Sequence, residues 1–181
     1  PNLNDLIKAV DHVLTKDGTF IFEEPYLGSM FKKVSYDQIY DAHIFMFSAH
    51  SVRSIFKTHG FDLIDLVPQK THGGSMRYFF SRNKIQEQSV KEYLKLEEKF
   101  QVSNDITYQK FRDKSINVCT NLKNFLIEKK NEGKSVCGYG ATAKSTTLLN
   151  FAEINSSLID CIYDSTPAKI GKLTPGTHIP I

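Results

Sequence analysis

The stretch that decides the fold is Ser135–Asn150, with the sequence SVCGYGATAKSTTLLN. A short apolar run leads into glycines at Gly138 and Gly140, and Lys144 and a helix-like apolar pattern follow. This order predicts a strand, a glycine turn and a helix. Glycines let the backbone approach an anion, and the free N–H groups of a helix N-terminus carry a partial positive charge. The stretch therefore predicts a phosphate-binding turn in an α/β protein.

Three interpretations of this turn differ in their ligand. As a P-loop it has Gly138 and Lys144, but Ala143 stands where the second glycine belongs, and no convincing magnesium-binding aspartate accompanies it. As a dinucleotide-binding turn it fits the looser G-x-G-x-x-A form, and Asp164 ends the next strand, where a ribose-binding acid would lie. As a plain turn it binds nothing. Phosphate binding is favoured over redox use of NAD, because no hydride-transfer site accompanies the turn.

The composition is that of a folded globular protein, with 181 residues of which 40% are hydrophobic and 12% aromatic. The formal net charge of +3 is too small to indicate nucleic acid or a membrane surface as a partner. Three widely spaced cysteines without a CxxC pair argue against a disulfide framework or a zinc site in this chain. Neither a signal peptide nor an apolar run of about 20 residues is visible. We expect a cytoplasmic protein with no metal ligands in this chain, and the oligomeric state stays open.

Helix and strand patterns alternate along the chain. We expect helices at 3–14, 48–59, 85–100, 107–130 and 144–151, and strands at 19–23, 61–67, 76–80, 135–139 and 158–163. The adjacent strands 61–67 and 76–80 predict an antiparallel edge hairpin on a mostly parallel sheet, and 135–163 predicts a parallel β-α-β unit. A shift to charged and polar residues places a domain boundary after residue 82. Both ends have the pattern of a cut chain, so we expect a fragment.

A cluster of candidate proton-transfer groups lies in Tyr36–Ser48, YDQIYDAHIFMFS. Histidine titrates near neutral pH, which suits His43 as a general base, and Tyr40 could hold or protonate an oxyanion. In the alternative interpretation these rings only pack in an aromatic-rich linker with Phe45 and Phe47, and the residues by themselves favour that alternative.

The sequence THGGS, Thr71–Ser75, couples His72 to two glycines directly before an expected strand. Gly73 and Gly74 could let the backbone meet a ligand. A plain hairpin turn explains the same residues equally well, so the pattern leaves both interpretations open.

The chain resembles the family of S-adenosylmethionine (SAM)-dependent sugar C-methyltransferases, which methylate a carbon of nucleotide-linked deoxyhexoses. Four segments resemble the family's motifs and follow its order: YDQIYDAHIFMFS, THGGSMR, GYGATAKSTTLLN and DSTPAKIGKLTPGTHIPI. In that family a zinc-binding lobe and a SAM-binding Rossmann-like domain precede a C-terminal α/β domain, which helps to bind the nucleotide sugar.

The resemblance implies a fold for each half of the chain. Residues 1–82 would form the C-terminal half of a Rossmann-like SAM-dependent methyltransferase domain, and residues 83–181 most of a second Rossmann-like α/β domain. The zinc cysteines and the SAM glycine loop would lie upstream. We therefore expect a fragment that is inactive alone, from an enzyme that uses SAM and carries zinc in an upstream lobe.

The resemblance also implies site residues. His43 matches the base that removes the C3 proton of a 4-keto sugar, so that the enolate attacks the methyl group of SAM, and Tyr40 matches a tyrosine near the sugar. The family usually has a glutamate directly before that histidine, where this chain has Ala42. The other implied residues are Tyr36, His72, Arg77, Gly138, Tyr139, Gly140, Lys144, Ser145 and Thr146 for the nucleotide sugar, and Glu23, Glu24 and Tyr26 for the SAM cleft.

Two alternatives to this enzyme stay open. One is a non-catalytic nucleotide-binding module, which the turn at Gly138–Thr146 would explain without any chemistry. The other is a methyltransferase relative that acts on another ketone or has lost activity, which Ala42 keeps open. In the leading interpretation the turn holds the diphosphate of a nucleotide sugar.

Overall fold

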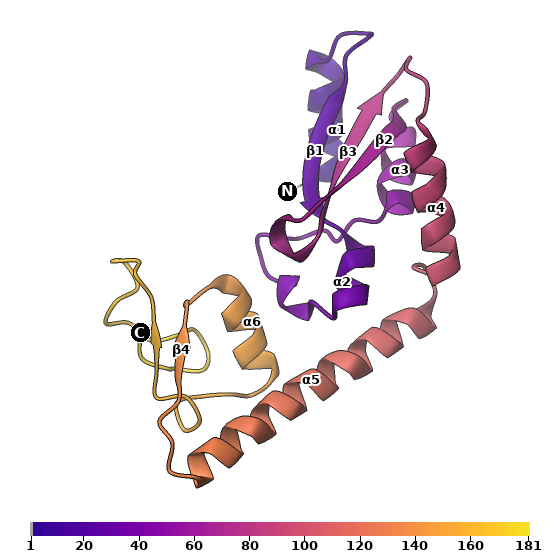
Figure 1. Ribbon diagram of the computed structural model, residues 1–181. Helices are drawn as coiled ribbons and strands as arrows, with labels where there is room; N and C mark the ends of the chain where they lie inside the picture. The colour runs from indigo at the N-terminus through magenta and orange to yellow at the C-terminus, as the bar shows by residue number, and fades with distance from the viewer. Residues whose placement is uncertain (1) are drawn as a thin grey trace. The chain divides into compact units, whose positions relative to one another are not determined.

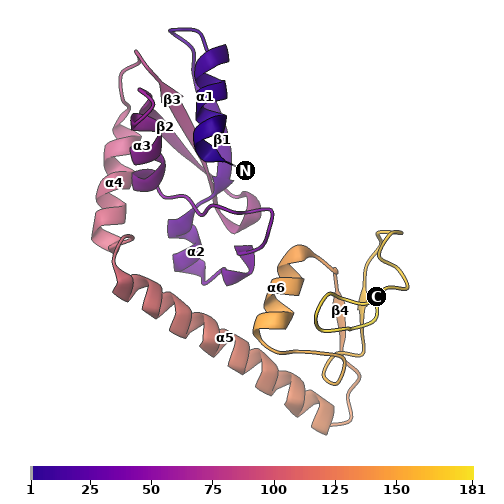
Figure 2. The ribbon, with the colours of Figure 1, turned by 180° about the vertical axis from the view of Figure 1, so that it is seen from behind.

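The computed structural model describes residues 2–181, which fold as two compact α/β units. The first unit contains the residues up to 33 together with 45–108, and the second contains 34–44 and 109–181. The two units are drawn in Figure 1 and, from behind, in Figure 2. The α/β fold class is confirmed.

The first unit is built on a three-stranded sheet. Its elements are α1 (Leu3–Val13), β1 (Phe20–Pro25), α2 (Leu27–Lys33), α3 (Ala49–Lys57), β2 (Asp62–Gln69), a 3-10 turn (Thr71–Gly73), β3 (Ser75–Ser81) and α4 (Gln88–Phe100). The strands lie in the order β1-β3-β2, and β3 is antiparallel to both neighbours.

The predicted antiparallel edge hairpin of β2 and β3 is confirmed, but the mostly parallel sheet expected beside it is not what the described residues form. β2 lies at the edge and β3 pairs with both β2 and β1, and both ladders of this sheet are antiparallel instead of mostly parallel. The physical reason is the burial of β3, in which most side chains are inaccessible, including Met76, Tyr78 and Phe80. A strand with so little exposed surface is stabilised best with a neighbour on each side.

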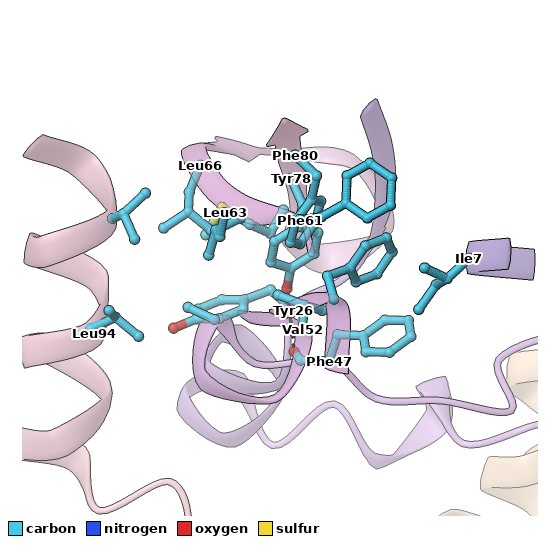
Figure 3. Packing of buried hydrophobic residues seen from close by; sticks show 14 of the residues in the cluster. Ile7, Tyr26, Phe47, Val52, Phe61, Leu63, Leu66, Tyr78, Phe80 and Leu94 are labelled. Atoms are coloured by element: carbon cyan, nitrogen blue, oxygen red, sulfur yellow. Dashed lines mark hydrogen bonds between the residues drawn. The ribbon is translucent and has the colours of Figure 1, made fainter. Parts of the chain in front are cut away.

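Aromatic side chains form the core on one face of this sheet. Phe56 of α3 stacks on Phe80 with ring centroids 4.0 Å apart and on Phe22 at 5.7 Å. Helices α1 and α3 cover this face, behind the sheet in Figure 1 and in front of it in Figure 2. Figure 3 shows Ile7 of α1 and Leu94 of α4 completing the cluster. Each such buried side chain stabilises the unit by about 1.5–3 kcal/mol.

The second unit contains the predicted β-α-β unit. Its elements are a 3-10 turn (Tyr36–Gln38), most of α5 (Asp105–Asn131), β4 (Cys137–Tyr139), α6 (Ala143–Phe151) and β5 (Cys161–Tyr163). β4 and β5 are parallel, as predicted. Its own core includes the fully buried Ile154 and Ile179, so it does not depend on the aromatic core of the first unit.

All the helices and strands expected from periodicity are present, with their ends shifted by a few residues. Helix α2 and the two 3-10 turns were not predicted. The predicted domain boundary between residues 82 and 83 of this chain stays a prediction. The compact units of this chain have other limits, since α4 contributes Val90 and Leu94 to the core of the first unit. None of the helices among residues 2–181 is both long and apolar enough to cross a membrane.

Candidate functional site

Two of the predicted groups lie in the second unit: the segment with Tyr40 and His43, and the turn before α6. Helix α6 contacts this segment directly. The hydroxyl of Thr147 donates a hydrogen bond of 3.1 Å to the carbonyl oxygen of Ile39, and the rings of Phe151 and Tyr36 contact with centroids 5.3 Å apart. The helix that begins at the glycine turn therefore also holds the segment with the candidate base.

Tyr36 anchors this segment from inside. It is only 7% exposed, and its hydroxyl oxygen accepts a hydrogen bond from Cys119 Sγ of α5 at 3.0 Å. Burial, and then the contact with Cys119, raise the pKa of Tyr36 well above its usual range. Tyr36 was predicted to bind the substrate, and in this chain its ring and its hydroxyl both contact other parts of the second unit.

Tyr40 and His43 lie next to each other. Their rings contact edge to face with centroids 4.8 Å apart, and the backbone N–H of His43 donates to the carbonyl of Tyr40 at 2.9 Å. Both side chains are partly exposed. The exposed Ala42 between them has only a methyl group, which offers no hydrogen bond to the imidazole. The imidazole of His43 and the hydroxyl-bearing ring of Tyr40 are thus adjacent.

The turn before α6 has the geometry of an anion site. Thr142 and Ser145 form a capping box, in which Ser145 N donates to Thr142 Oγ1 at 3.1 Å and Thr142 N to Ser145 Oγ at 2.8 Å. Gly140 has φ of 90°, which glycine adopts without a steric penalty. Among residues 2–181, the N–H groups of Ala143 and Lys144 meet no hydrogen-bond acceptor. Two donors at this helix end are therefore available to a ligand.

The side chains of this turn divide into two groups. The hydroxyls of Ser145 and Thr146 both donate to the carbonyl of Thr142, at 2.8 and 3.2 Å, and so stabilise the helix start. The side chains of Tyr139 and Lys144 do not take part in these contacts: Tyr139 is 90% exposed, and Lys144 forms no ion pair with any residue that the structure describes. Of the residues predicted to bind the nucleotide sugar at this turn, Lys144, the exposed Tyr139 and the backbone donors are thus the ones whose polar atoms are available.

Asp164 lies at the end of β5, where the dinucleotide interpretation expected a ribose-binding acid, but its carboxylate stabilises the turn itself. It accepts hydrogen bonds from the N–H of Thr166 at 2.8 Å, from Ala141 N at 2.8 Å and from Lys169 Nζ at 3.1 Å. The hydrogen bonds from Thr166, and then those from Lys169 and Ala141, hold the pKa of Asp164 well below its usual range. The turn is therefore fixed in place before any ligand binds.

In the first unit, Glu23 and Arg77 face each other as ladder partners on β1 and β3. Arg77 Nη2 lies 3.0 Å from Glu23 Oε2, and the hydroxyl of Thr71 donates to Glu23 Oε1 at 2.6 Å. The hydrogen bonds from Thr71 and then from Arg77 lower the pKa of Glu23. Sequence reasoning missed Thr71, although it is the first residue of the THGGS motif, because a turn threonine is common without any partner.

The THGGS turn holds His72 in a left-handed backbone conformation, with φ of 49°. This is uncommon for a residue other than glycine, and such strained positions gather at functional sites. The next residues explain why the turn needs glycines: Gly74 has φ of 132°, and a Cβ there would lie 2.6 Å from Ser29 Oγ. Lys33 Nζ donates to the carbonyl of Gly73, so the turn is also held from α2. The His72 side chain is exposed.

Of the residues predicted to line the SAM cleft, Tyr26 is buried, and its hydroxyl donates to Glu97 Oε1 at 2.9 Å. Glu97, which is 1% exposed, also accepts from the N–H groups of Ala49 at 2.6 Å and His50 at 3.0 Å. Burial and the neighbouring Glu97 raise the pKa of Tyr26 far above its usual range. Glu24 is partly buried. Sequence reasoning missed Glu97, because nothing in KLEEKF distinguishes it from its charged neighbours.

No group of three or more histidine, cysteine, aspartate or glutamate side chains within residues 2–181 is arranged to hold a metal ion.

Comparisons with known proteins show the family to which this chain belongs. Residues 70–181 match the family described as C-methyltransferase C-terminal domain. The curated protein "C-methyltransferase NovU" of Streptomyces niveus is 30% identical over 184 residues, which cover the whole of this chain and 44% of that relative. The chain thus spans less than half the length of this curated relative.

Proposed function

The chain belongs to the C-methyltransferase C-terminal domain family, and from this premise we propose that it is part of a SAM-dependent C-methyltransferase acting on a nucleotide-linked keto-deoxysugar. The observation that carries the proposal is that helix α6 joins the two parts of the site that such a substrate needs. Its N-terminus offers donors for a diphosphate, and Thr147 on the same helix contacts the segment that contains Tyr40 and His43.

The diphosphate would bind at the N-terminus of α6. The free N–H groups of Ala143 and Lys144 and the Lys144 ammonium together provide two backbone donors and one positive charge. A helix N-terminus attracts anions through these donors and through its dipole. Gly140 leaves room for close approach, since it has no side chain between the backbone and the phosphate.

The reacting ketone would lie at Tyr40 and His43. A 4-keto group makes the neighbouring C3–H acidic, and the His43 imidazole takes that proton while the electron pair moves onto the carbonyl oxygen. The Tyr40 hydroxyl donates a hydrogen bond to the resulting enolate oxygen, which stabilises the negative charge. SAM, when bound in the full-length enzyme, supplies the electrophilic methyl group that C3 takes up.

Two of the three residues predicted to line the SAM cleft, Glu23 and Tyr26, fit that role poorly in this chain. Both carboxylate oxygens of Glu23 are taken by Thr71 and Arg77, and the hydroxyl of Tyr26 is taken by the buried Glu97. We therefore assign no contact with SAM to them. In this proposal SAM binding and the zinc lobe belong to upstream parts of the enzyme, so the chain alone is not expected to transfer methyl groups.

Methyl transfer by the full-length enzyme tests this assignment. With labelled SAM and a nucleotide-linked 4-keto sugar, His43→Gln should lower turnover by about 10²–10⁴. The matched control is His12→Gln on α1, which should leave turnover unchanged because His12 is exposed and lies in the first unit. Turnover that is equal in the two variants would remove His43 from the mechanism.

Substrate choice separates the proposal from its alternatives. Calorimetry on the 181-residue chain should detect binding of dTDP or UDP sugars. Tight binding of ATP or NAD, with no affinity for nucleotide sugars, would instead favour a non-catalytic nucleotide-binding module. A third outcome is a relative that acts on another ketone. It is suggested by Ala42, which stands where the resemblance implies a glutamate before His43. Methylation of a different ketone by the full-length enzyme would identify such a relative.

A further inference from the structure

Two cysteines of the second unit form a pair that the proposed methyl transfer does not use. Cys137 on β4 and Cys161 on β5 are ladder partners, and their Sγ atoms lie 3.3 Å apart. Ladder partners point to the same face of a sheet. On this face Cys137 is exposed and Cys161 partly exposed, next to the exposed Tyr139 and Tyr163. The pair is therefore accessible to reagents in solution.

The geometry of the ladder suits a disulfide. Neighbouring strands lie about 4.7–4.9 Å apart, and disulfides join Cα atoms about 4.4–6.8 Å apart. Rotation of the two side chains is thus enough to bring the sulfurs of Cys137 and Cys161 to bonding distance, without movement of the backbone. The third cysteine offers an internal contrast: Cys119 is 6% exposed, and its thiol donates to the Tyr36 hydroxyl.

We propose that Cys137 and Cys161 form a dithiol modification site, which closes to an intramolecular disulfide by exchange with a low-molecular-weight disulfide such as oxidised glutathione. This inference goes beyond the proposed function and does not depend on it. It differs from the expectation that the spacing of the three cysteines argues against a disulfide framework in this chain.

The hydrogen bond between the thiols indicates the order of the steps. Cys161 Sγ–H donates to Cys137 Sγ, and this hydrogen bond is the main cause that raises the pKa of Cys161. Cys161 therefore keeps its proton, and the exposed Cys137 reacts first. The Cys137 thiolate attacks one sulfur of glutathione disulfide, so that a mixed disulfide forms and one glutathione leaves with a proton. Cys161 then loses its proton and attacks the Cys137 sulfur, which releases the second glutathione. Two protein thiols are oxidised by two electrons, and one glutathione disulfide is reduced to two glutathiones.

The disulfide would fix the strands that carry the turn before α6. Gly138 directly follows Cys137, and Gly140 N donates to the carbonyl of Tyr163 at 2.7 Å. A covalent bond between β4 and β5 opposes their separation, and opening of these strands is what exposes their N–H groups to exchange. Oxidation should therefore slow hydrogen exchange in Gly138–Ala141.

Incubation of the 181-residue chain with oxidised glutathione, followed by peptide mass spectrometry, tests the proposal. The wild-type chain should give one product, a peptide crosslinked through Cys137 and Cys161. Cys161→Ser should instead trap the Cys137–glutathione adduct, which persists about tenfold longer or more, because the resolving thiol is missing. Cys119→Ser is the matched control and should react like the wild type, since Cys119 is buried.

Circular dichroism tests whether each variant is folded. Hydrogen exchange of the oxidised wild type measures the effect of the disulfide on the turn. Exchange in Gly138–Ala141 should slow by about tenfold or more after oxidation. Separate glutathione adducts on Cys137 and Cys161, a dimer linked through Cys137, or modification of Cys119 at the same rate would each overturn the proposal. A crosslinked chain with unchanged exchange would overturn the effect on the turn.

Discussion

Helices α3 and α6 begin in the same way and differ in what their first N–H groups contact. Each has a capping box, Ser48 with Ser51 in α3 and Thr142 with Ser145 in α6. In α3 the first two N–H groups donate to the buried carboxylate of Glu97. In α6 the equivalent N–H groups have no acceptor anywhere in residues 2–181. The first helix end is closed by an anion of the protein, and the second is open to an anion from solution.

The difference also shows what an anion contributes at such a position. Glu97 connects α4 with the N-terminus of α3 and with the hydroxyl of Tyr26, which lies between β1 and α2, so one carboxylate links three segments of the first unit. Hydrogen bonds to a charged acceptor are stronger than neutral ones, and a helix dipole adds to them. A phosphate at α6 would make the corresponding contacts with Ala143 and Lys144, but as a ligand that can leave.

Removal of the anion from α3 should have the largest effect. Glu97→Ala leaves the buried Tyr26 hydroxyl and the N–H groups of Ala49 and His50 without an acceptor, which should lower the free energy of unfolding of the first unit by about 3–5 kcal/mol. Urea denaturation followed by hydrogen exchange in α3 measures this loss.

Two further variants show whether the charge itself matters. Glu97→Gln keeps one oxygen acceptor and should lose less stability than Glu97→Ala. Glu92→Ala, on the exposed side of α4, should change stability by no more than about 0.5 kcal/mol. A loss as small for Glu97→Ala as for Glu92→Ala would mean that the carboxylate does not hold the end of α3.

Addition of an anion to α6 should have the next largest effect. A nucleoside diphosphate such as UDP should slow hydrogen exchange of the Ala143 and Lys144 N–H groups, while those of Ala49 and His50 are already protected by Glu97. Lys144→Ala should weaken the affinity about tenfold, since it removes a charge-assisted contact. Calorimetry against Lys134→Ala, which changes an exposed lysine outside this turn, gives the comparison. Equal affinities in the two variants would exclude Lys144 from the anion site.

The sequence predicted the features of the two helix ends that depend on neighbouring residues, but not the contact with Glu97, which lies far away in the sequence. A helix that starts at residue 48, and the order of strand, glycine turn and helix before α6, could be predicted because helix starts and turns depend on residues a few positions apart. Glu97 lies 48 residues from Ala49 in the sequence, and no periodic pattern connects them. The central place of β3 has the same cause, since a hairpin pattern defines one neighbour of a strand and the second neighbour, β1, comes from far along the chain.

The candidate site also has contacts between neighbouring residues, which the sequence could predict, and contacts between distant residues, which it could not. The pairing of Tyr40 with His43 follows from adjacent residues, so the sequence could predict it. The contact between Thr147 and Ile39 joins residues 108 positions apart, and only the fold could bring them together. For Glu23, the sequence predicted an acid at the end of a strand but not its partners Thr71 and Arg77, which take up both of its oxygens.

Removal of the caps should have a smaller effect than removal of the anion. Ser48→Ala and Thr142→Ala each delete a side-chain oxygen that accepts from the third N–H of the helix, at 3.1 Å in both cases. Each should cost about 1 kcal/mol of local stability, measured by hydrogen exchange in α3 and α6. We expect added UDP to offset part of the loss in Thr142→Ala and none of it in Ser48→Ala. Equal behaviour of the two variants with UDP would contradict the contrast between an open and a closed helix end.

The smallest expected effect is the response of the second unit to acid. Hydrogen bonds from Lys130, Ser135 and the Val136 N–H lower the pKa of Asp160 to about 2. A group whose folded pKa is lowered stabilises the fold above its unfolded pKa of about 3.9, and this contribution is lost as the pH falls toward the folded value. The second unit should therefore become slightly less stable between about pH 4 and pH 2. Because Asp160 is exposed, salt should weaken the effect.

The variant Asp160→Asn tests how much of this pH dependence of stability comes from Asp160. The asparagine cannot titrate, so the variant should lose the part of the pH dependence that Asp160 causes, while Asp164 keeps its own, because its pKa is lowered in the same direction by Thr166 and Lys169. Urea denaturation at pH 5 and pH 3, followed in β4 and β5 by hydrogen exchange, measures the difference. An unchanged pH response in Asp160→Asn would show that the ion pair with Lys130 does not stabilise the strand pair next to the open helix end.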